Sequence, residues 1–196
     1  MTSLSHLLEE VRACRVCEAS LEAGPRPIVQ VGSHASVVII GQAPGRRVHE
    51  SGVPWDDPSG VRLRGWLGLS EDEFYDPDRV ALIPMGFCYP GKGRSGDLPP
   101  RPECAPLWHE RLLAHLPEDR LQVIIGQYAQ ARYLPDRSAS LTETVRRWEA
   151  FLPDRVVMPH PSPRNVRWLG ANPWFEAETV PAIRARVKEV LAPHAT

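Results

Sequence analysis

The sequence is organised around one segment, Ser36-Val37-Val38-Ile39-Ile40-Gly41-Gln42-Ala43-Pro44-Gly45. Its first half is a continuous apolar, β-branched run, which is typical of a strand buried on both faces of a parallel sheet. Its second half contains two Gly and one Pro, and predicts a turn at the carboxyl end of that strand. In open α/β sheets ligands bind beyond the carboxyl ends of strands, so we expect residues of this turn to contact a ligand.

Other apolar runs predict the remaining elements of the fold. Residues 80–83, 121–126 and 155–158 read as further strands, and 27–31 as a short additional one. Apolar residues at helical spacing, together with capping residues, predict helices between and around them; the expected helical ranges are 4–11, 59–67, 70–75, 103–116, 128–134, 141–151 and 174–191. Residues 89–102 are rich in Gly, Pro and Ser and are expected to form a long ordered loop. This alternation predicts a three-layer α/β/α fold with a four-stranded, mainly parallel central sheet.

Composition limits the class of protein. The chain has 196 residues, 42% hydrophobic and 24% charged, with a net charge of −1. These values are ordinary for a globular protein, and the net charge excludes a bulk polycation. From its length we expect a single domain over residues 1–196. We also expect a monomer. No apolar run approaches membrane-spanning length and the first residues do not resemble a signal peptide, so we expect no membrane association and a cytoplasmic location.

Cys14, Cys17, Cys88 and Cys104 are the only cysteines. A Cys-x2-Cys pair followed by two distant cysteines is a spacing that can close a four-thiolate site, which suits zinc or an iron–sulfur cluster. In a cytoplasmic protein such cysteines are more plausibly metal ligands than disulfides. The alternative is four unrelated core cysteines.

A last motif, His160-Pro161-Ser162-Pro163-Arg164-Asn165, follows the predicted strand 155–158. Segments 41–45, 84–88 and 160–165 all fall at the carboxyl ends of predicted strands. Three loops at one sheet edge predict one site.

Together these motifs resemble the uracil-DNA glycosylase superfamily, most closely its four-cysteine, iron–sulfur-containing bacterial and archaeal family. That family has Gly-Glu-Ala-Pro-Gly followed after six residues by Gly-x-Pro-Phe; here Gly41–Gly45 and Gly52-Val53-Pro54-Trp55 correspond. The four cysteines match the family's cluster ligands, and His160–Pro163 is similar to the His-Pro-Ser-Pro of several glycosylase families. The resemblance implies a monofunctional DNA glycosylase of base excision repair. Such an enzyme hydrolyses the N-glycosidic bond of uracil or a related deaminated base in single- or double-stranded DNA, and carries a 4Fe-4S cluster.

The reaction needs a group that stabilises the departing base anion, tolerance of positive charge near C1′, and a positioned water. We expect neutral His160 to donate to the base O2; the alternative is a loop histidine with a structural hydrogen bond. Asp57 is expected to orient water, or to cap the helix that begins near Ser59, or both. Gln42 can position water or the base through its amide.

The remaining expected contacts are to DNA in which the target nucleotide is flipped out of the helix. Trp55 is expected to stack on the extruded base, the alternative being a core Trp under a loop. The predicted base-binding residues are Gly41, Gln42, Ala43, Trp55 and His160. Ser162 and Pro163 are expected to pinch the DNA backbone, and Arg164 to fill the space that the base leaves. Asn165 completes this DNA-binding group.

Two departures from the family pattern concern the base. The family reads uracil with an Asn four residues before the third Cys, where this chain has Pro84, and its motif Glu is replaced by Gln42. The alternative function is therefore a catalytically weak or inactive nucleic-acid or nucleotide-binding protein of the same fold. For the metal, zinc is the alternative to the cluster.

Overall fold

Four parallel strands form the central sheet of the protein, which a computed structural model describes over residues 2–192. The strand order is β2-β1-β5-β6, and every pair of neighbours is parallel. The strands are β1 (Val37–Ile40), β2 (Val80–Leu82), β5 (Leu121–Ile125) and β6 (Arg155–Met158). All residues of β1 and β2 are buried, as expected for strands covered on both faces.

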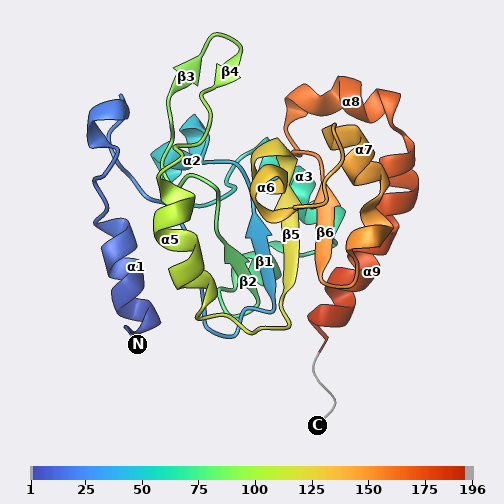
Figure 1. Cartoon of the computed structure of the whole chain (residues 1–196), viewed down its shortest axis with the longest axis horizontal. Coiled ribbons are helices and arrows are strands. Elements are labelled where there is room, and N and C mark those ends of the chain that lie inside the picture. The colour runs from blue at the N-terminus through green and yellow to red at the C-terminus, as the bar shows by residue number, and fades with distance from the viewer. Residues whose placement is uncertain (1, 193–196) are drawn as a thin grey trace.

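Helices cover both faces of this sheet and complete three layers. Figure 1 shows α5 and α6 in front of the sheet and α3 behind it. Helix α1 packs on α5, and α9 packs on α3. The α-helices are α1 (Leu4–Arg12), α2 (Arg46–Ser51), α3 (Pro58–Leu67), α4 (Glu71–Tyr75), α5 (Cys104–Leu113), α6 (Gly126–Tyr133), α7 (Leu141–Arg146), α8 (Val166–Ala171) and α9 (Val180–Val190). The predicted three-layer α/β/α class with a four-stranded parallel sheet is confirmed.

Several local expectations were wrong. Residues 27–31 contribute only an isolated antiparallel bridge from Gln30 to Leu82, instead of a strand. The segment 89–102, expected to be a loop, contains a two-stranded hairpin of β3 (Lys92–Gly93) and β4 (Gly96–Asp97). The expected helix 141–151 is divided into α7 and a 3-10 turn, Trp148–Phe151. The closing helix begins with a π-helical segment, Phe175–Thr179, that leads into α9.

The carboxyl ends of the four strands meet at one edge of the sheet. In Figure 1 the hairpin β3–β4 and helix α8 rise beyond that edge, on opposite sides of it. A 3-10 turn, Pro163–Asn165, leads directly into α8. Within residues 2–192, the helices are too short or too polar to cross a membrane.

Candidate functional site

A cavity of about 650 Å³ opens at the carboxyl edge of the sheet, a volume typical of small-molecule sites. Loops after all four strands contribute to its wall, and the hairpin β3–β4 supplies one side. Among the residues predicted to act in the site, those on its wall are Gln42, Ala43, Trp55, Asp57, His160, Ser162, Pro163, Arg164 and Asn165. The structure therefore gathers in one place side chains that the sequence separates by more than a hundred positions.

His160 is held as a neutral imidazole. The backbone N–H of Ser162 donates to His160 Nδ1 at 3.2 Å. Since a backbone N–H can only donate, Nδ1 is unprotonated and the neutral ring carries its proton on Nε2. Burial lowers the pKa of His160 below its ordinary value of 6.5, and the nearby Asp57 carboxylate opposes that shift only in part. At neutral pH His160 is therefore an uncharged hydrogen-bond donor on the cavity wall.

Two side chains hold the loop that carries His160. Arg62 of α3 donates through Nη1 to the carbonyl oxygens of Pro161 and Ser162, at 3.3 and 3.2 Å. Asn165 donates through Nδ2 to the His160 carbonyl oxygen at 2.7 Å. Asn165 was predicted to bind DNA; in this structure its amide nitrogen fixes the backbone of the histidine loop.

Trp55 stands beside His160 on the cavity wall. Their ring centroids are 5.7 Å apart and their planes differ by 29°. A Cβ at Gly41 would lie 2.6 Å from the Trp55 ring, so only glycine lets the indole lie over the end of β1. The Trp55 ring therefore covers Gly41, which does not itself line the cavity. The backbone of Trp55 has φ of 59°, a left-handed conformation that is rare for aromatic residues and typical of constrained functional sites.

The two neighbouring aspartates have different surroundings. Asp57 caps α3: its Oδ1 accepts from the Gly60 N–H at 2.8 Å. Its second oxygen has no hydrogen-bond partner within residues 2–192, and the residue lies on the cavity wall. Asp56 lies away from the wall and makes a loose ion pair with Arg47 at 3.9 Å. The geometry therefore supports capping by Asp57 and leaves one carboxylate oxygen free for a ligand.

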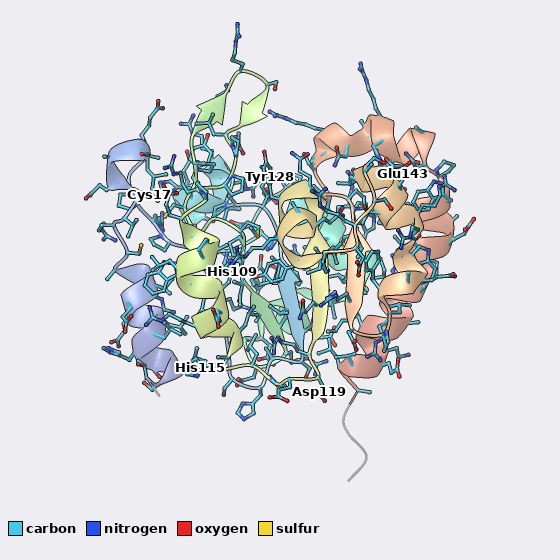
Figure 2. All side chains as sticks on the ribbon, viewed as in Figure 1. Cys17, His109, His115, Asp119, Tyr128 and Glu143 are labelled. Atoms are coloured by element: carbon cyan, nitrogen blue, oxygen red, sulfur yellow. The ribbon has the colours of Figure 1, made fainter. Side chains whose placement is uncertain are left out.

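Pro84 occupies the wall at the end of β2 and is held by a buried histidine. His109 Nε2 donates to the Pro84 carbonyl oxygen at 2.9 Å, and the Tyr133 hydroxyl bonds to His109 Nδ1. The His109 ring is stacked between Phe87 and Tyr133, with centroid distances of 5.7 and 5.9 Å. Figure 2 shows His109 on the side of α5 that faces the sheet. This arrangement ties Pro84 to both α5 and α6.

His109 gives the fold a specific pH dependence. Burial lowers its pKa from 6.5 to about 4, so below pH 6.5 the unfolded chain binds a proton that the folded chain does not. The free energy of unfolding is therefore highest above pH 6.5. It decreases as the pH falls to about 4, by about 3 kcal/mol in total. We expect His109→Gln, which retains a donor for Pro84, to lose this part of the pH dependence. Urea unfolding at pH 7 and pH 4.5 measures it; equal pH dependence in the two proteins would contradict the assignment.

The hairpin and the histidine loop are joined across the cavity. Arg164 donates through Nη1 to the Ser95 carbonyl oxygen at 3.1 Å. The hairpin also brings Asp97 to the cavity wall, where its carboxylate raises the pKa of Tyr89 together with the larger effect of burial. Arg164, expected to fill the space left by a flipped base, lines the cavity in this structure and is bonded to the hairpin.

The four cysteines line a second cavity, between the segment after α1, the start of α5 and the loop after β2. Figure 2 shows Cys17 beyond the end of α1. Burial raises the pKa values of Cys88 and Cys104 to about 11, so without a metal these thiols stay protonated. The other lining residues in the described range include Leu21, Phe87, Trp108 and the charged Arg101. The Arg101 and Glu103 side chains also lie beside Cys17. As the side chains are placed, residues 2–192 contain no group of three or more His, Cys, Asp or Glu that would hold a metal ion.

Several polar residues of the site were not predicted from the sequence. Gln127, Ser59 and Asp97 line the cavity, and Arg62 supports the histidine loop. Ser59 is 6% exposed, and no partner for its hydroxyl occurs in the described part of the chain. Gln127 follows a predicted strand end, and this position at the carboxyl edge of the sheet is the same signal that marks the other site loops. Arg62 and Asp97 gave no comparable indication.

The fold and the site define an α/β protein that presents an aromatic wall, a neutral histidine and a free carboxylate oxygen at the carboxyl edge of a parallel sheet. A comparison with protein-family models matches residues 29–184 to the Uracil DNA glycosylase superfamily. The match covers most of the chain, so this protein belongs to that superfamily. Members of the superfamily are generally hydrolytic DNA glycosylases, and DNA is the partner on which they act.

Proposed function

We propose that this protein is a monofunctional DNA glycosylase that releases uracil or a related deaminated base from DNA during base excision repair. The observation that carries the proposal is the neutral His160. Because Nδ1 accepts a hydrogen bond from the Ser162 N–H, the proton of the neutral ring lies on Nε2, which can donate it to a ligand. A neutral donor stabilises the anion of the departing base as charge develops on its O2. Trp55, next to His160 on the wall, offers a flat surface on which an extruded base can stack.

The other wall residues divide the remaining tasks. The free oxygen of Asp57 is the candidate to orient the attacking water and to favour positive charge at the sugar. Gln42 is the candidate to place that water or the base, since its amide both donates and accepts. Ser162 and Pro163 form the turn that would press on the DNA backbone, and Arg164 would leave Ser95 to occupy the gap in the base stack.

We also propose that the four cysteines hold a 4Fe-4S cluster. The support is chemical: four thiols line one cavity, whose wall includes no carboxylate or histidine among residues 2–192, and this donor set suits iron–sulfur clusters or zinc. When bound, the cluster would ionise the four thiols and tie the segment after α1 to α5 and to the loop after β2. Its role would be structural. Zinc in the same thiolates is the alternative.

Base release from defined oligonucleotides tests the glycosylase. Labelled single- and double-stranded oligonucleotides with uracil, hypoxanthine or xanthine are incubated with the protein and treated with alkali, which cleaves at abasic sites. We expect cleavage at uracil or at one of the other deaminated bases. If no base is released but the oligonucleotides are still bound in a gel-shift assay, the protein is a binding protein of this fold. Pro84, in place of a side chain that reads uracil, is the observation that favours this alternative.

The two roles of Asp57 can be separated by one substitution. Asp57→Asn preserves the cap, because Asn is as good an N-cap residue as Asp, but it removes the charge. We expect unfolding free energy to change by less than about 0.5 kcal/mol and base release to slow by about 10²-fold or more. Single-turnover release and urea unfolding measure the two effects. Asp56→Asn, one residue away and off the cavity wall, is the matched control; equal slowing in both variants would show that the Asp57 charge has no specific role.

A further inference from the structure

The order of the strands determines which loops reach the same part of a bound base. Gln42, Pro84, Gln127 and His160 each lie two residues beyond the end of their strand, and all four line the cavity. The strand order places them along the edge as Pro84, Gln42, Gln127 and His160. Neighbouring strands are about 4.8 Å apart, so Gln127 stands one strand from His160. Pro84 stands three strands, or roughly 14 Å, from His160.

Gln127 is also free to act. It lies in the first turn of α6, and no residue in the described range 2–192 forms a hydrogen bond with its side chain. Gly126 has φ of 76°, and a Cβ there would lie 3.6 Å from the Cβ of His160. This turn directs the chain from β5 past the His160 loop. Tyr128, the next residue, lies at the upper end of α6 in Figure 2, at the edge where the hairpin rises.

We propose that Gln127 reads the Watson–Crick edge of the base while His160 bonds to the base O2. The inference rests on the proposed function and names a base-binding residue for the same cavity. N3 of a pyrimidine is the ring atom next to C2, so a side chain one strand from His160 is well placed for that edge. The Gln127 amide supplies one donor and one acceptor, which matches N3–H and O4 of uracil.

The absence of a partner for Gln127 has a consequence for selectivity. An amide that nothing fixes can rotate by half a turn, and then its donor and acceptor match N3 and N4–H of cytosine. Binding through Gln127 therefore accepts uracil and cytosine alike. Selectivity for uracil then arises in bond cleavage, because the uracil anion spreads its charge over two carbonyl oxygens.

Binding of uncleavable oligonucleotides tests this assignment. Single strands carry one 2′-fluoroarabino-uridine, one 2′-fluoroarabino-cytidine or one tetrahydrofuran abasic analogue; the fluorine suppresses cleavage by disfavouring positive charge at the sugar. We expect the wild type to bind the uracil and cytosine strands within about threefold of each other. Gln127→Leu and Gln127→Glu are expected to weaken both by about tenfold, the loss from one or two hydrogen bonds. Abasic binding should not change. Gln122→Leu, at the opposite end of β5, is the matched control.

The outcomes separate this inference from the glycosylase proposal. Unchanged base binding by both Gln127 variants would overturn the inference, and uracil release by the wild type would leave the glycosylase intact. A wild type that binds uracil more than about a hundredfold tighter than cytosine would also overturn it, because a fixed reader would then exist elsewhere. If the strands bind as expected but neither uracil nor another deaminated base is released, the glycosylase proposal is wrong and the Gln127 assignment stands.

Discussion

His160→Ala is expected to lower the rate of base release by about 10²- to 10³-fold, the usual cost of removing one donor to a developing anion. Affinity for DNA should stay nearly unchanged, because the bond from Nε2 strengthens only as the base becomes anionic. Single-turnover release and fluorescence anisotropy with the same oligonucleotide measure the two quantities. His34→Ala is a suitable control, because His34 is exposed and lies before β1, at the opposite end of the sheet.

The pH profile gives a second test of His160. Burial lowers its pKa below 6.5, so the neutral form persists to a more acidic pH than in a free histidine. Base release should therefore fall only as the pH drops through this lowered pKa, and His160→Ala should lack that step. Equal rates for the variant and the wild type would assign His160 a structural role and place the donor to O2 elsewhere.

Cys88→Ser is expected to abolish metal binding. Anaerobically purified wild-type protein should be brown and contain about four irons per chain, as a four-thiolate cluster requires. The variant should be colourless, poorly soluble and much less stable, because the energy of binding a structural metal is part of the folding energy. Metal analysis and thermal unfolding measure these effects. Val16→Ser is a control in the same region, since Val16 is 65% exposed and supplies no ligand.

The metal content also decides between the two candidate metals. A colourless wild-type protein with one zinc per chain would show that the four cysteines hold zinc and not the cluster. Loss of stability without loss of metal in Cys88→Ser would show that Cys88 is a core cysteine and not a ligand.

The sheet could be predicted from sequence because its determinants are local. The run 37–40 is wholly apolar and β-branched, and the structure buries all of it. The turn after this strand and the motif at 160–165 were also readable, because strand ends in a parallel sheet share one edge. Helix α2 was missed because it has only six residues and its N-cap, Gly45, has no side chain to form a cap. The hairpin β3–β4 was missed because its strands have two residues each and lack an apolar pattern.

The support of the site depends on contacts between residues that are distant in the chain. Arg62 of α3 donates to the Pro161 carbonyl oxygen, 99 residues away. His109 of α5 donates to the Pro84 carbonyl oxygen. No periodicity or motif in the sequence predicts such pairs, because each contact depends on how α3 and α5 pack against the sheet. The strands and the site loops follow from short-range patterns of apolar residues and glycine, and the four-thiol set follows from the spacing of the cysteines between Cys14 and Cys104. The burial that lowers the pKa of His160 and the meeting of His160, Asp57 and Gln127 on one cavity wall follow from packing, which brings separate chain segments together.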